Sequence, residues 1–238
     1  MRFEIEETVR GPETPDLKSN LDEELVIKEI DALIARPESF LGEGKTAEVR
    51  IMSGNENCCM KIVDDIRLNK LYDTDRPRYN SEKVEFDLLQ QAHAISGKVK
   101  VPRPYLAWKI HTDTDRQIGV LVMERLPAFS LKQIHEGARL PKGFNIQTFF
   151  SDLREYLERL HSELNIHHRD IAEGNILVDK NTGAPYLIDF GDSAAAWPGE
   201  NVYKSKDTFG RTLHNYPEDN RALNDVQKRL SFLPQLTK

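Results

Sequence analysis

The stretch of sequence that decides the fold reads HRDIAEGNILVDKNTGAPYLIDFG over residues 168–191. An HRD triplet opens it, Asn175 stands five residues after the aspartate of that triplet, and a DFG triplet closes it. Two apolar runs separated by an Asn-Thr-Gly turn lie between the triplets and predict a β-hairpin. Seven specified residues at this spacing make coincidence a poor explanation.

The two triplets resemble the catalytic and metal-binding loops of the protein-kinase-like superfamily. This resemblance implies an ATP-dependent enzyme that transfers the γ-phosphate to a hydroxyl group. Asp170 would accept or orient the hydroxyl proton, and Arg169 would stand beside it in the catalytic loop. Asn175 and Asp189 would supply hard oxygen ligands to Mg²⁺ or Mn²⁺. Gly191 is expected to permit the sharp turn that directs Asp189 to the metal.

Upstream residues follow in the order that the family requires. Residues 41–49 (LGEGKTAEV) resemble the glycine-rich loop over the ATP phosphates, with Gly42 and Gly44 present and Ala47 in place of the third glycine. A phosphate-binding loop of the Walker A type is excluded, because the residue at position 39 is serine where that motif needs glycine. Lys61 follows Cys-Cys-Met where kinases carry Val-Ala-Ile, so it is expected to bind the α- and β-phosphates as a point charge.

A glutamate on the following helix is expected to pair with Lys61. Glu85 is the preferred candidate, because Leu88 and Leu89 share its helix face and would hold it towards the core. Glu82, one turn earlier, is the alternative. The long separation between Lys61 and this helix is attributed to an inserted loop at 73–80.

Residues 123–126 (MERL) resemble the hinge between kinase lobes, with Met123 as gatekeeper. The Glu124 carbonyl and the Leu126 amide are expected to bind the adenine edge. The residues expected to line the adenine slot are apolar or weakly polar: Val49, Cys59, Leu177 and Ile188.

The apolar periodicity predicts an α+β, two-lobed chain with a β-rich front half and a helical back half. The resemblance implies that this is a protein-kinase-like fold with a β-rich N-lobe and a truncated helical C-lobe. The expected domains are an N-terminal extension with a helix (1–37), the N-lobe (38–126) and the shortened C-lobe (127–238). The first twenty residues are expected to be loose. The expected elements are helices at 21–35, 81–94 (with Val84, Leu88 and Leu89 for packing), 145–164 and 218–233, and strands within 40–63, at 120–123, at 176–178 and at 186–188.

The chain departs from the family after the DFG triplet. Only 47 residues follow Gly191, and no Ala-Pro-Glu motif occurs among them. This short C-terminal region resembles the RIO kinases, the KEOPS-complex kinase and compact bacterial effector kinases.

Ala172 stands where serine/threonine kinases usually carry lysine. Asp207 is the expected anchor beneath the catalytic loop. Arg169 is expected to clamp a phosphorylated side chain, for which the candidates are Ser193, Tyr203, Ser205 and Thr208.

Composition narrows the class of protein. Apolar residues make up 39% and charged residues 30% of the chain, and the net charge is −6. A binder of nucleic acid or of an anionic membrane needs a basic face, so both are disfavoured. No apolar run is long enough to span a bilayer. Cys58 and Cys59 are adjacent and cannot link distant segments, so inert buried thiols are expected. The default compartment is the cytoplasm, with export as an effector without a cleaved signal as the alternative.

The favoured function is a minimal serine/threonine protein kinase, dependent on ATP and Mg²⁺, that phosphorylates itself. Its expected partners are ATP and a protein substrate or an activating protein that supplies the missing docking surface. The alternatives are a small-molecule kinase and a pseudokinase scaffold that binds partners with little turnover. The presence of Lys61, Asp170, Asn175 and Asp189 together disfavours the scaffold.

Overall fold

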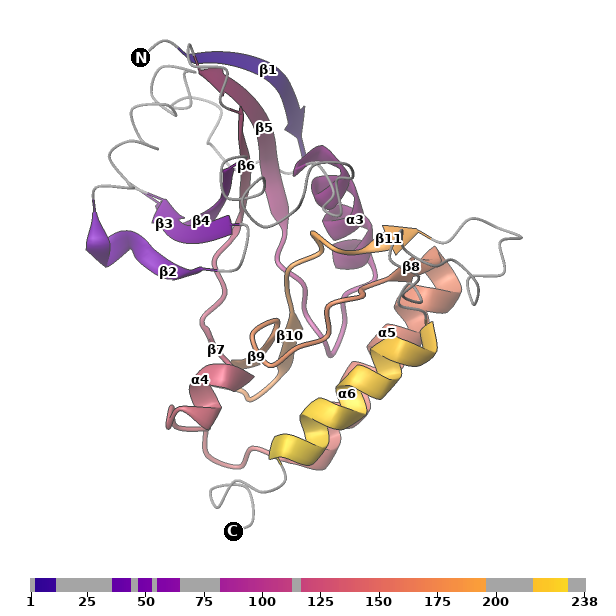
Figure 1. Cartoon of the computed structure of the whole chain (residues 1–238). Coiled ribbons are helices and arrows are strands. Elements are labelled where there is room, and N and C mark those ends of the chain that lie inside the picture. The colour runs from indigo at the N-terminus through magenta and orange to yellow at the C-terminus, as the bar shows by residue number, and fades with distance from the viewer. Residues whose placement is uncertain are drawn as a thin grey trace, which may run out of the picture. The chain divides into compact units, whose positions relative to one another are not determined.

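The structure is a computed structural model that describes residues 3–11, 36–43, 47–52, 55–64, 82–112, 117–195 and 216–230 (Figure 1). The helix expected at 21–35 and the loop at 73–80 lie outside these residues, as do Gly44, Asp207 and three of the four candidate phosphorylation sites (Tyr203, Ser205 and Thr208). The chain divides into two compact units, Met1–Gln90 with Arg103–Leu126, and Gln91–Pro102 with Pro127–Lys238.

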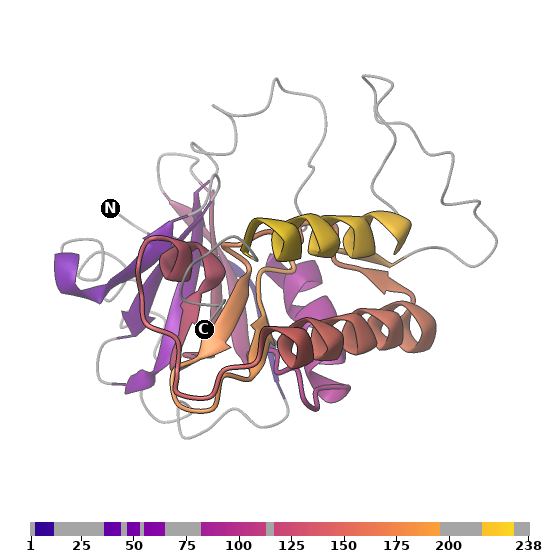
Figure 2. The same ribbon diagram turned by 90° about the horizontal axis from the view of Figure 1, so that it is seen from below.

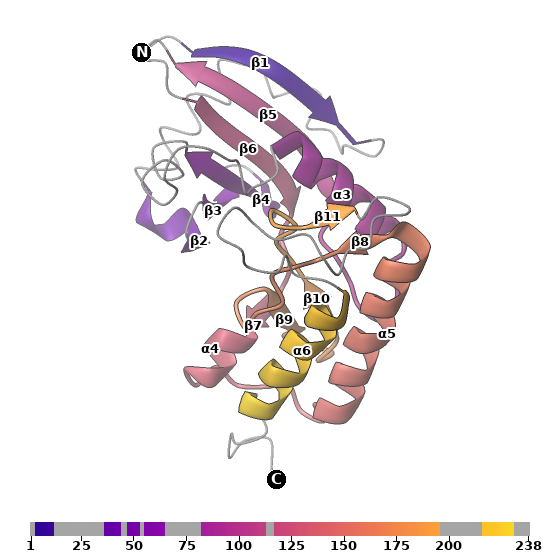
Figure 3. The same cartoon turned by 45° about the vertical axis from the view of Figure 1, so that its right-hand side comes forward.

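The first unit is built on a six-stranded antiparallel sheet with the strand order β1-β5-β6-β4-β3-β2 (Figure 3). The strands are β1 (Phe3–Arg10), β2 (Phe40–Glu43), β3 (Ala47–Met52), β4 (Asn55–Asp64), β5 (Pro104–Thr112) and β6 (Gln117–Glu124), and the short 3₁₀ helix η2 (Pro37–Ser39) precedes β2. The strands predicted within 40–63 and at 120–123 are confirmed by β2, β3, β4 and β6.

Strand β1 corrects the expectation of a loose N-terminus for residues 3–10, whereas residues 12–20 lie outside the described part of the chain. It pairs with β5 from Phe3 opposite Thr112 to Arg10 opposite Leu106, with a register shift between Ile5 and Glu7. In the sequence Phe3 and Ile5 alternate with glutamates, which is a strand pattern. The shift breaks the alternation before Val9, so the pattern is too short to be distinctive.

Alternation along β4 sends its two cysteines to opposite faces of the sheet. Cys58 joins a buried apolar cluster with Met60 and Ile62 of the same strand. Cys59 lies on the other face with Lys61. The other members of the cluster are Met52, Leu106, Trp108, Ile110, Ile118, Val120 and Val122. The core of this unit therefore leaves one face of β4 to present Lys61.

Helix α3 (Glu82–Ala94) belongs to the predicted helix at 81–94. Leu88 and Leu89 are buried as expected, whereas Val84 is 42% exposed and Phe86 is 1% exposed. Two helical steps turn the chain by about 200°, so these two side chains lie on nearly opposite faces. A Cβ on Gly119 of β6 would meet the Glu82 side chain, so the bare backbone of Gly119 leaves room for that carboxylate.

The second unit contains α4 (Leu131–His135), α5 (Ile146–Leu164) and α6 (Tyr216–Leu230). Its strands are β7 (Ala128–Ser130), β8 (Ile166–His167), β9 (Ile176–Asp179), β10 (Pro185–Leu187) and β11 (Ala194–Ala195), which form the sheets β10-β9-β7 and β11-β8. The predicted hairpin is therefore confirmed, as is the α+β class. No helix among the described residues is long and apolar enough to cross a membrane.

Helices α5 and α6 pack along each other (Figure 2). The Asn145 side chain caps α5 by accepting a hydrogen bond from Thr148 N at 3.0 Å. Arg154 of α5 donates to Asn224 of α6 at 2.9 Å. The helix predicted at 218–233 is α6, which begins two residues earlier, and it buries Leu223, Val226 and Leu230.

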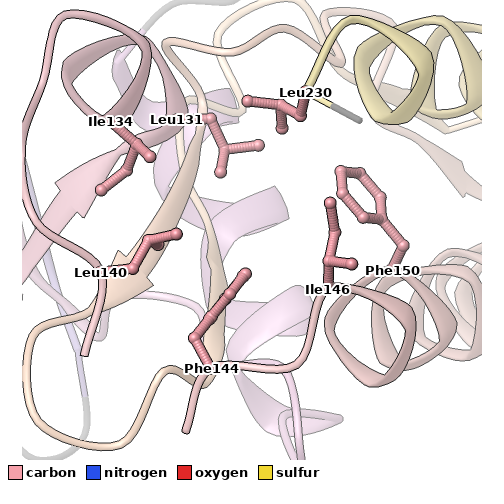
Figure 4. Close-up of a pocket in the computed structure, with 7 residues that line it drawn as sticks. All are labelled: Leu131, Ile134, Leu140, Phe144, Ile146, Phe150 and Leu230. Atoms are coloured by element: carbon pink, nitrogen blue, oxygen red, sulfur yellow. The ribbon is translucent and has the colours of Figure 1, made fainter. Parts of the chain in front are cut away.

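Apolar side chains of the second unit surround a pocket. A narrow pocket lies between α4, the segment before α5, the first turns of α5 and the end of α6 (Figure 4), and it is lined by Leu131, Ile134, Leu140, Phe144, Ile146, Phe150 and Leu230. Burying these side chains fixes the C-terminal end of α6 against α4. Helix α6 is thus held near its C-terminal end by Leu230 in this pocket. Near its N-terminal end it carries Asp219, whose contacts are described below.

A buried aspartate shapes the β9–β10 turn. Asp179 accepts hydrogen bonds from Asn181 N at 2.8 Å, Thr182 N at 2.7 Å and the Tyr186 hydroxyl at 2.7 Å. Burial raises the pKa of Asp179, but these donors, first the Thr182 N–H and then the Tyr186 hydroxyl, outweigh it and lower the pKa to about 2.

We predict that Asp179→Asn destabilises the protein by about 1.5 to 3 kcal/mol at pH 7, the usual range for hydrogen bonds to a charged group. Because the folded pKa is depressed, this stabilisation is present above the unfolded pKa and is lost as the pH falls through about 2. Denaturant unfolding from pH 7 down to pH 3 should therefore show the gap between wild type and variant shrinking below about pH 5. A gap that stays constant to pH 3 would contradict this, and the exposed Asp225→Asn is the control.

Candidate active site

Lys61 and Glu85 form a buried ion pair in the first unit. Lys61 Nζ donates to the two carboxylate oxygens of Glu85 at 2.7 and 2.9 Å, and the two side chains are 8% and 5% exposed. Strand register places Lys61 opposite Val49 on β3 and Leu121 on β6. Glu82, the alternative partner, lies instead beside Gly119.

The rest of the expected nucleotide-binding surface of this unit lies on β2, β3, β4 and β6. Gly42 is opposite Val49, and a side chain at Gly42 would meet open space. Cys59 is opposite Met123. Directly opposed residues share a face of an antiparallel sheet, so Val49, Cys59 and Met123 lie on the same face as Lys61.

The expected hinge is held by backbone and thiol contacts. Glu124 N donates to Arg103 O at 2.9 Å, and Arg125 N donates to Asn57 O at 2.8 Å. The Glu124 carbonyl accepts a hydrogen bond from Cys59 Sγ at 3.7 Å. Leu126 is half-buried and ends this unit.

The thiol beside the hinge is unreactive. Burial raises the pKa of Cys59 to about 12, with further increases from Cys58 and Glu124 that exceed the opposing effect of Arg125. Burial and then Glu124 also raise the pKa of Cys58. Neither thiol forms thiolate at neutral pH, in keeping with the prediction of inert thiols.

The catalytic loop of the second unit is anchored by Asp219 near the start of α6. Its carboxylate accepts hydrogen bonds from Arg169 N at 2.8 Å, His168 N at 2.9 Å and His161 Nε2 at 2.9 Å. Arg169 has a φ of 69°, a conformation that costs a non-glycine residue about 1–2 kcal/mol. Burial raises the pKa of Asp219, but the hydrogen bond from His161, together with His168 and the Arg169 N–H, lowers it below its usual value. Asp219 is therefore an anion at neutral pH.

Asp219 is the residue that sequence reasoning missed, since Asp207 was the expected anchor. The signal was present in the closing helix. Asp219 lies four residues before Leu223, seven before Val226 and eleven before Leu230, so it occupies the apolar stripe of that helix. An aspartate on a buried stripe needs hydrogen-bond donors, and the backbone of the catalytic loop supplies them.

Asp170 and Asn175 lie against each other. Asn175 Nδ2 donates to Asp170 Oδ2 at 2.7 Å and to the Asp170 carbonyl at 2.9 Å. Asn175 N also donates to Ala172 O at 3.0 Å. The turn between the two residues is thereby closed, and Asp170 is oriented through its side chain and its backbone.

The DFG triplet is joined to the same loop. Ile188 N donates to Asn175 O at 3.0 Å. The His168 ring lies 3.0 Å from Ile188 O and packs on the Phe190 ring in a T-shaped arrangement, with 4.9 Å between ring centroids. The left-handed residue is Asp189, with a φ of 67°, and not Gly191, which corrects the role expected for that glycine. Gly191 instead donates its N–H to Asp189 Oδ1 at 3.3 Å.

The donor set fits a magnesium ion. Asn175 uses its amide nitrogen on Asp170, which leaves Oδ1 as the atom suited to a metal. Asp189 would contribute a carboxylate, and it directly follows Ile188, whose N–H donates to Asn175 O. Two hard oxygen donors, completed by water and phosphate oxygens, are the usual protein contribution to a Mg²⁺ site.

The remaining predicted residues are placed as follows. Leu177, on β9, and Ile188, directly after β10, are both half-buried in the second unit. Ser193 is 1% exposed, and its hydroxyl donates to His168 O at 3.1 Å. Ser193 is therefore a structural contact of the catalytic loop, and its burial disfavours it as a phosphorylation candidate.

Comparison with known proteins assigns the family. The family model for the protein kinase domain matches residues 36–214, which is well over half of the chain. Over 162 residues the chain is 24% identical to casein kinase II subunit alpha′ of Saccharomyces cerevisiae. The aligned part is 67% of this chain and 42% of that relative, so the chain spans less than half the length of the yeast protein.

The chain belongs to the protein kinase family. Asp219 lies five residues beyond the stretch that matches the family model, although it anchors the central loop of that stretch. The matches are to the general kinase domain and to a casein kinase subunit, so the finer resemblance to RIO and KEOPS kinases stays a prediction.

We predict that Lys61→Met destabilises the protein by about 3 kcal/mol, because it removes the cation from a buried carboxylate. The double variant Lys61→Met with Glu85→Leu should recover most of this loss, since both charges are then gone. Denaturant unfolding measures both effects. The control is Lys98→Met, which removes an exposed ion pair with Glu155 and should cost under about 1 kcal/mol. A loss in Lys61→Met no larger than in the control would contradict the prediction.

Proposed function

We propose that this protein is an ATP- and Mg²⁺-dependent serine/threonine protein kinase that also phosphorylates itself. The observation that carries the proposal is the hydrogen bonding of the catalytic loop. The Asn175 side chain donates to Asp170, and the Asn175 carbonyl accepts from the N–H of Ile188, the residue before Asp189. The buried Lys61–Glu85 pair supports it independently from the other unit.

The predicted nucleotide-binding residues act on different parts of ATP. Lys61, oriented by Glu85, binds the α- and β-phosphate oxygens, and residues 42–44 cover them through their backbone. The Glu124 carbonyl and the Leu126 amide bind the adenine edge, with Val49, Cys59, Leu177 and Ile188 around the ring. Asn175 and Asp189 hold the metal, which neutralises charge on the phosphate oxygens when it is bound.

Asp170 acts on the acceptor. Its carboxylate accepts a hydrogen bond from the substrate hydroxyl and takes the proton as that oxygen bonds to the γ-phosphorus and the bond from phosphorus to the ADP oxygen breaks. The hydrogen bond from Asn175 fixes the direction of one carboxylate oxygen. Most of the barrier is removed by positioning and by charge neutralisation.

Three further parts of the proposal follow. The N-lobe is assigned to 38–126 and the C-lobe to 127–238, with 1–37 as an N-terminal extension whose strand β1 pairs with β5 of the first unit. Gln91–Pro102, inside the N-lobe bounds, belongs to the second compact unit. An activating protein partner is proposed to raise the activity. The cytoplasm is the compartment, which agrees with two free, buried cysteines.

The test is incubation of the purified chain with γ-labelled ATP and Mg²⁺, with and without a generic acceptor protein. We expect wild type to label itself and the acceptor on serine or threonine, identified by mass spectrometry. Asp170→Asn and Asp189→Asn should reduce labelling by at least about a hundredfold. The control, Asp225→Asn on the exposed face of α6, should retain wild-type labelling.

Three other results of this experiment would each contradict one part of the proposal. Equal labelling by wild type and Asp170→Asn would overturn the role of Asp170. Nucleotide binding without transfer to any protein would favour a small-molecule kinase or a strict requirement for a partner. Absence of nucleotide binding would favour a pseudokinase scaffold.

A further inference from the structure

Glu173, in the middle of the catalytic loop, is held by three contacts. Its carbonyl accepts a hydrogen bond from Lys132 N at the start of α4, at 3.0 Å. Its carboxylate lies 2.9 Å from Arg229 Nε near the end of α6 and 3.3 Å from His135 Nδ1 at the end of α4. The Glu173 side chain is 18% exposed, although it belongs to a surface turn.

The turn that carries Glu173 sets the position of Asn175. Asn175 N and Ile176 N both donate to Ala172 O, at 3.0 and 3.2 Å, so residues 172–176 move together. Asn175 in turn orients Asp170 through two hydrogen bonds. A displacement at Glu173 is therefore transmitted to both residues.

Helix α6 reaches this loop at both of its ends. Asp219 binds the backbone of His168 and Arg169 before the catalytic aspartate, whereas Arg229 binds Glu173 after it. The two α6 residues are ten positions apart, which is about 15 Å along a helix. The apolar pocket that includes Leu230 fixes the end of α6 that carries Arg229.

We infer that Glu173, Arg229 and His135 form a second clamp that positions the catalytic loop for phosphoryl transfer, opposite the Asp219 anchor. Its effect on turnover rests on the proposed function. Glu173 is a positioning residue, because it acts through Asn175 and Asp170. Arg229 is 59% exposed and His135 is 46% exposed, so the clamp tunes the rate and does not determine the fold.

The kinetic test compares Arg229→Gln and Glu173→Gln with Arg221→Gln, which removes an exposed arginine from the same helix. In the phosphotransfer assay we expect each clamp variant to lower kcat by about threefold to fivefold, with the KM for ATP changed by less than about twofold. The exchanged pair Glu173→Arg with Arg229→Glu should regain at least half of the wild-type kcat. Arg221→Gln should behave as wild type.

A second measurement does not depend on activity. Hydrogen exchange followed by mass spectrometry should show amides 172–176 of the full chain exchanging at least about threefold faster in Arg229→Gln than in Arg221→Gln. Wild-type exchange in both clamp variants would overturn the clamp, as would a kcat loss that the exchanged pair does not restore. If wild type transfers no phosphate, the proposed function fails and the exchange measurement alone decides the clamp.

Discussion

The loop that carries the HRD triplet depends on one buried carboxylate. Asp219 binds the backbone N–H groups of His168 and Arg169 and the ring of His161. The left-handed backbone of Arg169 costs about 1–2 kcal/mol, whereas each hydrogen bond to a charged acceptor contributes about 1.5–3 kcal/mol. The two backbone bonds therefore exceed the strain, and the loop keeps a shape that presents Asp170. The contacts of Asn175, His168 and Phe190 build on that loop, and the hairpin of β9 and β10 carries Asp189 to it.

Much of this arrangement could be predicted because its signals are local. The HRD and DFG triplets, the turn between them and the amphipathic helix before them are read from neighbouring residues, so the α+β class and the elements around the site follow. The choice of Glu85 also followed from a local rule. Leu88 and Leu89 mark the buried face of α3, and the carboxylate on that face lies 2.7 Å from Lys61.

The parts that could not be predicted depend on long-range contacts. Strand β1 has a weak alternation of its own and is a strand because β5 pairs with it. The three-residue β7 and the five-residue α4 are too short for periodicity to show. Glu173 looks like a surface acid until the fold brings Arg229 to it. Asp219 lies on the apolar stripe of α6, but only the fold shows that the backbone of the catalytic loop supplies its donors. The role predicted for Gly191 was wrong because glycine permits a left-handed turn without requiring one. The residue with the left-handed backbone is Asp189.

The most direct test of this account is amide hydrogen exchange by NMR at His168 and Arg169 in the full chain. Both amides donate to Asp219, so we expect each to exchange at least about a hundredfold more slowly than the amide of Gly174, an exposed turn residue of the same loop. Asp219→Asn should bring at least one of the two rates close to that of Gly174, because an amide group replaces one of the two acceptor oxygens. Exchange of His168 and Arg169 as fast as Gly174 in the wild-type chain would contradict the anchor, and with it the account of how the catalytic loop is held.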